Sequence, residues 1–195
     1  MPGTAEAGRP RDPSIDDRVL EITRRQLAEH GYDGLTLSAV AREAGTTRPA
    51  LYRRWPGKAE LATAAIAALS VSHSRAASGD PFADLVAELT AFRRGVTCPD
   101  GLSLVGTMLQ RRTDPELVRL YRERVVAPRR RRLRAILDRA VSGGVLPGGD
   151  VELAVASLTG SFYALALAGH VPRQWPARAA AHAWRALGGE PPLQA

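Results

Sequence analysis

The most constraining feature of this chain is the stretch TLSAVAREAGTTRPALYRRWPGKAEL, residues 36–61, which predicts two short helices joined by a tight turn. Thr36 stands before an apolar helical pattern and can cap the first helix, which should end at Gly45. Thr47 can cap the second helix, where Pro49 falls in the first turn and costs no hydrogen bond. These are the dimensions of a helix-turn-helix, whose second helix fits the major groove of DNA.

The charge of this stretch favours a polyanionic partner. Between residues 36 and 58 a single acid, Glu43, stands against five cationic residues: Arg42, Arg48, Arg53, Arg54 and Lys58. Lys58 is the only lysine in the chain and lies at the expected start of a third helix, where free N–H groups also favour a phosphate. The whole chain carries a formal charge of +7, which agrees with a nucleic-acid partner.

The same residues resemble the DNA-binding domain of the TetR family of bacterial regulators, over about residues 16–68. The resemblance lies in the Thr before the first short helix, in Ala44-Gly45, in Thr47-Arg48, and in the runs 51–55 and 57–61. It implies an all-helical homodimer that binds a palindromic operator through its N-terminal domains. It also implies a C-terminal domain whose small ligand releases the DNA. Pro49 departs from the family pattern, in which a Gly or a small polar residue is common.

Helical periodicity continues to the C-terminus and predicts an all-α chain of about nine helices. The expected organisation is a flexible N-terminal arm over residues 1–13, a helix-turn-helix DNA-binding domain over 14–60, and a helical ligand-binding and dimerisation domain over 61–195. The arm either reaches a minor groove through Arg9 and Arg11 or remains a solvated tail. The first helix should end at Gly31, and Pro128 should kink or divide a long helical pattern over residues 113–143.

The outward positions of the helix-turn-helix nominate the DNA contacts. Phosphate contacts from Thr36, Thr47, Tyr52 and Lys58 would fix the position of the protein along the DNA duplex. Base edges would be met by Arg48, Ala50 and Arg53, and Thr46 and Pro49 complete the candidate surface. Two such surfaces on a twofold dimer would read an inverted repeat in double-stranded DNA.

Apolar residues of the C-terminal part suggest a ligand site and a subunit contact. The candidate ligand-lining residues, which could equally be ordinary core, are Phe92, Met108, Leu109, Tyr121, Phe162 and Tyr163. Few acids accompany them, so an apolar or anionic small molecule is the expected effector. The apolar segment 151–169 resembles a membrane span, but polar residues interrupt it, and its small residues recur every four positions. The candidate dimer contacts are Ala156, Gly160, Ala164 and Ala168, with Trp175 and Trp184 as anchors.

A second cationic region lies between residues 91 and 140, where thirteen arginines stand against five acids. The run Arg129 to Arg132 is read either as a further nucleic-acid or membrane contact or as the solvated face of a helix. The latter is favoured because no aromatic residue interleaves with the run.

Other functional classes find little support in the sequence. The four histidines lack metal-ligand or triad spacing, and Gly57-Lys58 lacks the upstream glycine of a phosphate-binding loop, so no metal, cofactor or enzymatic activity is expected. The single cysteine, Cys98, fits a reducing cytoplasm, with the protein associated with the nucleoid. Two alternatives remain: a ligand binder whose head no longer binds DNA, and an architectural protein that coats DNA.

Overall fold

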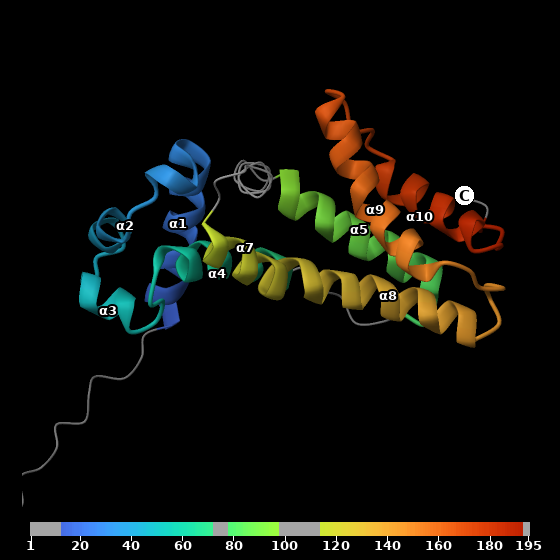
Figure 1. Cartoon of the computed structure of the whole chain (residues 1–195), viewed down its shortest axis with the longest axis horizontal. Helices are drawn as coiled ribbons and strands as arrows, with labels where there is room; N and C mark the ends of the chain where they lie inside the picture. The colour runs from blue at the N-terminus through green and yellow to red at the C-terminus, as the bar shows by residue number, and fades with distance from the viewer. Residues whose placement is uncertain (1–12, 72–77, 98–113, 193–195) are drawn as a thin grey trace, which may run out of the picture.

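A computed structural model describes residues 13–71, 78–97 and 114–192 of the chain, and over these ranges all regular structure is helical (Figure 1). Three helices form the head: α1 (Pro13–Gly34), α2 (Leu37–Glu43) and α3 (Arg48–Tyr52). The next helix, α4 (Lys58–Val71), packs along α1. The helical path of α1 breaks at Gly31, which has φ 67° and ψ −176°, so the predicted end of the first helix at this glycine is confirmed.

The remaining described helices form the body, which lies to one side of the head in Figure 1. These helices are α5 (Pro81–Thr97), α7 (Pro115–Tyr121), α8 (Ala127–Ser142), α9 (Val151–Leu167) and α10 (Trp175–Ala186), with a π-helical segment η1 (Arg122–Val126) between α7 and α8. The chain stays helical from α7 through η1 into α8, so the predicted division at Pro128 is wrong, and a kink at this proline stays a prediction. Pro128 lies in the first turn of α8, directly after the change of helical register.

Two clusters of buried apolar side chains hold the chain together. The first joins α1, α2, α3 and α4, and also takes in Leu117, Leu120, Tyr121 and Val125 from α7 and η1. The predicted domain boundary between residues 60 and 61 falls inside α4 and remains a prediction. Because α7 packs on the head and continues through η1 into α8, this helical stretch joins the head to the body.

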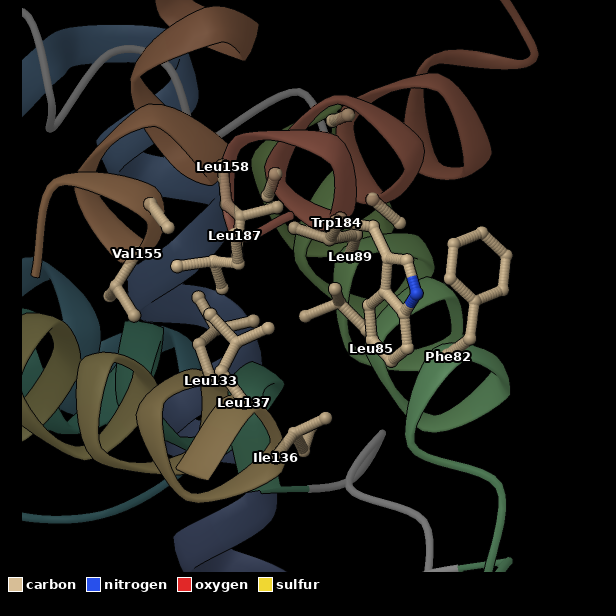
Figure 2. Packing of buried hydrophobic residues seen from close by; sticks show 14 of the residues in the cluster. Phe82, Leu85, Leu89, Leu133, Ile136, Leu137, Val155, Leu158, Trp184 and Leu187 are labelled. Atoms are coloured by element: carbon tan, nitrogen blue, oxygen red, sulfur yellow. The ribbon is translucent and has the colours of Figure 1, made fainter. Parts of the chain in front are cut away.

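The second cluster is the core of the body, formed by α5, α8, α9 and α10 (Figure 2). The Trp184 ring meets Phe82 edge-on, with ring centres 5.2 Å apart. Trp175 contacts Phe92 and Phe162 at 5.7 and 5.1 Å in the same core. Trp175 and Trp184 each expose 2% of their surface in the single chain, so they are core residues, and their assignment as dimer anchors is corrected.

The arginine run of α8 is largely tied to neighbouring helices. Arg132 pairs with Glu88 of α5 at 2.7 Å, and Arg130 pairs with Glu152 of α9 at 2.8 Å. Arg129 places its guanidinium 4.6 Å from the centre of the Phe92 ring. The count of charges over residues 91–140 did not include these ion pairs, because Glu88 and Glu152 lie outside that range. They reach the arginines only in the folded chain. The helix face is thus an ion-pair network and not simply a solvated surface.

Candidate nucleic-acid interface

Two threonine caps and one glycine set the geometry of the helix-turn-helix. The Thr36 hydroxyl accepts a hydrogen bond of 3.2 Å from the Ala39 N–H, and the Thr47 hydroxyl accepts one of 3.3 Å from the Ala50 N–H. Gly45, between the helices, has φ 67°, a conformation that residues with a Cβ rarely adopt. Both caps predicted from the sequence are therefore present, and α2 and α3 begin at fixed points.

The inner face of α3 is anchored in the head. Leu51 is buried, and Trp55 packs against the same cluster. Arg54 forms an ion pair with Asp16 of α1, with only 19% of the arginine side chain exposed. Arg54 therefore braces α3 against α1, and it adds less to the outward positive charge than the sequence count implies.

The outer face of α3 presents most of the predicted DNA contacts to solvent. Thr36, Thr47, Arg48, Pro49, Tyr52 and Arg53 are exposed, whereas Thr46 and Ala50 are half-buried. Arg48 donates a hydrogen bond of 3.1 Å to the Tyr52 hydroxyl and lies 5.3 Å from the centre of its ring. The exposed aromatic ring thus orients the guanidinium on the surface that the sequence nominated for base contact.

Lys58 belongs to this surface but is also held from within the head. Its ammonium donates a hydrogen bond of 3.0 Å to the Asp33 carbonyl and lies 4.6 Å from the centre of the Tyr32 ring. The Tyr32 hydroxyl in turn donates to Asp114 of α7 at 2.8 Å. Burial, followed by the hydrogen bond to Asp114, raises the pKa of Tyr32 far above its usual value. Sequence reasoning missed both Tyr32 and Asp114, since no local pattern links residues so distant along the chain.

The candidate ligand-lining residues are only partly brought together. Met108 and Leu109 lie outside the described residues. Phe92 meets Phe162 and Tyr163 edge-on at 5.3 and 5.8 Å in the body core, and Tyr121, which belongs to the cluster shared with the head, is close enough to Tyr163 for the two phenols to interact electrostatically. Burial raises the pKa of both Tyr121 and Tyr163. The cavity beside Phe92 and Arg129 has a volume of about 10 Å³, room for one water molecule.

The small-residue stripe of α9 lies on the surface of the single chain. Ala156, Gly160, Ala164 and Ala168 are all exposed, and Leu153 and Leu167 nearby expose 65% and 86% of their surfaces. An open groove of about 260 Å³ runs between this helix and α10, lined in part by Ser157, Ser161, Arg178 and His182. The stripe is therefore available to a second molecule.

Two further features were sought in the part of the chain that the structure describes: a cluster of metal ligands and a helix that could cross a membrane. Within residues 13–71, 78–97 and 114–192, no group of three or more His, Cys, Asp or Glu side chains could hold a metal ion. None of the helices in these ranges is both long enough and apolar enough to span a bilayer.

Comparison with known proteins gives matches over both parts of the chain. Residues 19–65 match the family model described as bacterial regulatory proteins, tetR family, and residues 75–183 match the tetracyclin repressor-like C-terminal domain. The chain is 50% identical over 66 residues to an uncharacterized HTH-type transcriptional regulator of Mycobacterium bovis, and this match spans 33% of that relative. It is 27% identical over 170 residues to the uncharacterized HTH-type regulator YdeS of Bacillus subtilis, covering 85% of each chain.

Solved structures extend the likeness to the whole fold. The TetR family transcription regulator SCO0332 superposes with a TM-score of 0.68 at 29% identity, over 89% of this chain and 98% of that one. A TetR transcriptional regulator from Agrobacterium tumefaciens gives a TM-score of 0.69 at 24% identity, over 91% of this chain and 94% of the other. This second likeness concerns the fold alone.

Proposed function

Because this chain belongs to the TetR family of bacterial transcription regulators, we propose that its head reads an inverted-repeat operator as part of a homodimer that a small molecule releases from DNA. The family consists of DNA-binding transcription factors and not of enzymes. The proposal adds the residues that make the contacts, the repeat that is read, and repression as its outcome. It also places the protein in the cytoplasm at the nucleoid.

The observation that carries the proposal is the outer face of α3. Its cap and glycine turn fix the helix, while Arg54 and Leu51 hold the inner side, so Arg48, Tyr52 and Arg53 project from a rigid support. Arginine can donate two parallel hydrogen bonds to guanine in the major groove, and one such pair contributes about 1–3 kcal/mol of base discrimination. Arg48 and Arg53 are the proposed readers of base edges. Thr36, Thr47, Tyr52 and Lys58 are the proposed phosphate contacts, with Thr46, Pro49 and Ala50 within the same surface.

A twofold dimer is supported by the exposed stripe of α9. Small side chains let two helices approach closely, and the neighbouring exposed leucines provide apolar area that a partner would cover. Two heads about one helical turn of DNA apart, roughly 34–36 Å, would then read the two halves of a palindrome.

The effector is proposed to act in the body. It can release DNA only if it binds one arrangement of the two heads more tightly than another. The proposed lining residues remain Phe92, Tyr121, Phe162 and Tyr163. Arg129 of α8 lies beside Phe92 and favours an apolar molecule with an anionic group. Because the cavity there holds about 10 Å³, the effector would have to open this part of the core.

Selection of bound duplexes from a random DNA pool tests the proposal. A regulator should enrich one inverted repeat, and its affinity for that repeat should exceed its affinity for unrelated DNA by about 10³-fold or more. A protein that coats DNA would bind with strong salt dependence and little sequence preference. A ligand binder with an inactive head would enrich nothing. Small-molecule fractions titrated against the selected complex would then reveal release.

A further inference from the structure

Tyr32 lies where the head meets the body and contacts both. The positive φ of Gly31 ends the regular part of α1, and Tyr32 follows with only 7% of its surface exposed. Its hydroxyl donates a hydrogen bond of 2.8 Å to Asp114 Oδ2, a residue 82 positions away in the sequence. Asp114 Oδ1 simultaneously accepts from the Glu116 N–H at 2.9 Å and caps α7. One carboxylate therefore fixes both the start of α7 and the tyrosine of the head.

The face of the same ring supports Lys58. The ammonium lies 4.6 Å from the ring centre, an arrangement in which the negative face of the ring attracts the cation. A second contact, the 3.0 Å hydrogen bond to the Asp33 carbonyl, comes from the residue next to Tyr32. An ammonium has three N–H donors, so a donor remains for a DNA phosphate while these contacts fix its position.

We propose that Tyr32 is a positioning residue that couples the body to DNA binding, by setting the place of Lys58 according to the position of Asp114. The inference rests on the proposed function, in which Lys58 contacts a phosphate. It adds a route from α7 to that contact and assigns roles to two residues, Tyr32 and Asp114, that lie outside the DNA-binding surface.

The packing explains why the hydrogen bond can transmit a shift. The Tyr32 ring is enclosed by the first apolar cluster and cannot follow Asp114 by rotating freely. A hydrogen bond of 2.8 Å weakens steeply when its atoms separate by an ångström, so a displacement of α7 either moves the ring or breaks the bond. Because α7 continues through η1 into α8, the position of Asp114 depends on the core of the body.

The test is a set of variants measured for binding to a fluorescent duplex obtained by selection from a random pool, at several salt concentrations. Tyr32→Phe keeps the ring beneath Lys58 and removes only the donor to Asp114. Asp114→Asn alters the acceptor, and Lys58→Met removes the phosphate contact. Each of the first two changes is also made in the Lys58→Met background. Asp150→Asn serves as the matched control, because Asp150 caps α9 through the Leu153 N–H at 2.9 Å. Circular dichroism establishes that each variant is folded.

The expected result is a shared, Lys58-dependent loss of affinity. Lys58→Met should reduce the slope of log affinity against log salt by about 1.8, the value for two phosphates, because each head of the dimer loses one contact. Tyr32→Phe and Asp114→Asn should each weaken binding by about fivefold, and the double variant should be no weaker than either one. Both effects should disappear in the Lys58→Met background, and Asp150→Asn should bind like the unaltered protein.

Different failures separate the coupling from the function beneath it. The coupling would be overturned if Tyr32→Phe and Asp114→Asn weakened binding just as much in the Lys58→Met background, or if neither single variant changed the affinity. The DNA-binding function would stand in both cases. If Tyr32→Phe does not fold, the test rests on Asp114→Asn, compared with and without Lys58→Met. Asp114 is exposed, so its substitution should not prevent folding. Enrichment of no duplex by the unaltered protein would overturn both proposals. An unchanged salt slope in Lys58→Met would remove the phosphate contact and the coupling with it.

Discussion

Arg48 donates a hydrogen bond of 3.1 Å to the hydroxyl of Tyr52, one turn further along α3, and its guanidinium lies 5.3 Å from the ring centre. A residue proposed to read bases is thus oriented by a residue proposed to contact phosphate. The two roles are therefore linked on the protein before any DNA is bound. Substitutions at the two positions should show this linkage.

Arg48→Ala should relax the choice of base at particular positions of the selected repeat, by about 1–3 kcal/mol, because a bidentate contact to guanine is lost. Tyr52→Ala should weaken all sequences and also relax part of the choice that Arg48 makes, since the guanidinium loses its support. Binding-site selection with both variants and their double variant measures this. Identical enrichment profiles for the two single variants would remove the assigned roles.

The ion pair between Arg54 and Asp16 should stabilise the head. Arg54→Met should lower the free energy of unfolding by about 1 kcal/mol, because Asp16 loses a partner in a partly buried setting. Arg53→Met is the matched control. Arg53 is adjacent to Arg54 in the sequence and is exposed, so its substitution should change the free energy of unfolding little. Equilibrium unfolding in urea compares the two, and equal losses would mean that Arg54 braces nothing.

Asp84, in the first turn of α5, should make the free energy of unfolding depend on pH. It accepts hydrogen bonds of 2.8 Å from both the N–H and the hydroxyl of Ser78, and it pairs with Arg139 at 3.0 Å. Partial burial acts to raise its pKa, but these partners outweigh burial and hold the pKa below its ordinary value of 3.8. Its contribution is then complete above about pH 5 and is lost as the pH falls through the lowered pKa.

Asp84→Asn should therefore cost roughly 1.5 kcal/mol at pH 7, where the charged acceptor is lost, and much less at pH 3. Urea unfolding of both proteins at the two pH values checks the difference. Asp138→Asn, at an exposed carboxylate of α8, provides the comparison. A cost that stays constant with pH would show that the charge of Asp84 does not contribute.

Gly160 should matter for association and not for the fold of the single chain. A Cβ at this position would meet nothing within 4 Å, so Gly160→Leu should leave the helical content of the single chain unchanged. If the α9 stripe forms the dimer contact, the added side chain should cost about 1–3 kcal/mol of association free energy. Sedimentation equilibrium measures this, with Ala135→Leu on the exposed face of α8 as control. An unchanged dimer would place the subunit contact elsewhere.

The sequence by itself determined the features that depend on neighbouring residues. Thr36 and Thr47 cap their helices, and Gly31 ends the regular part of the first helix. Each follows from the φ preference or the hydrogen-bonding groups of a residue and those within one turn of it. The outward face of the helix-turn-helix followed for the same reason, because helical periodicity alone separates Leu51 from Arg48 and Tyr52.

Only the tertiary structure decided what lies between distant segments. It buried Trp175 and Trp184 in the core of the chain, and it supplied Glu88 and Glu152 to an arginine run that appeared unpaired. It also brought Asp114 to Tyr32 across 82 positions. Such contacts depend on how whole helices pack, and many pairings of similar apolar stripes satisfy the same local preferences. The choice among them is made by the shape of the complete core, which no single stretch of sequence specifies.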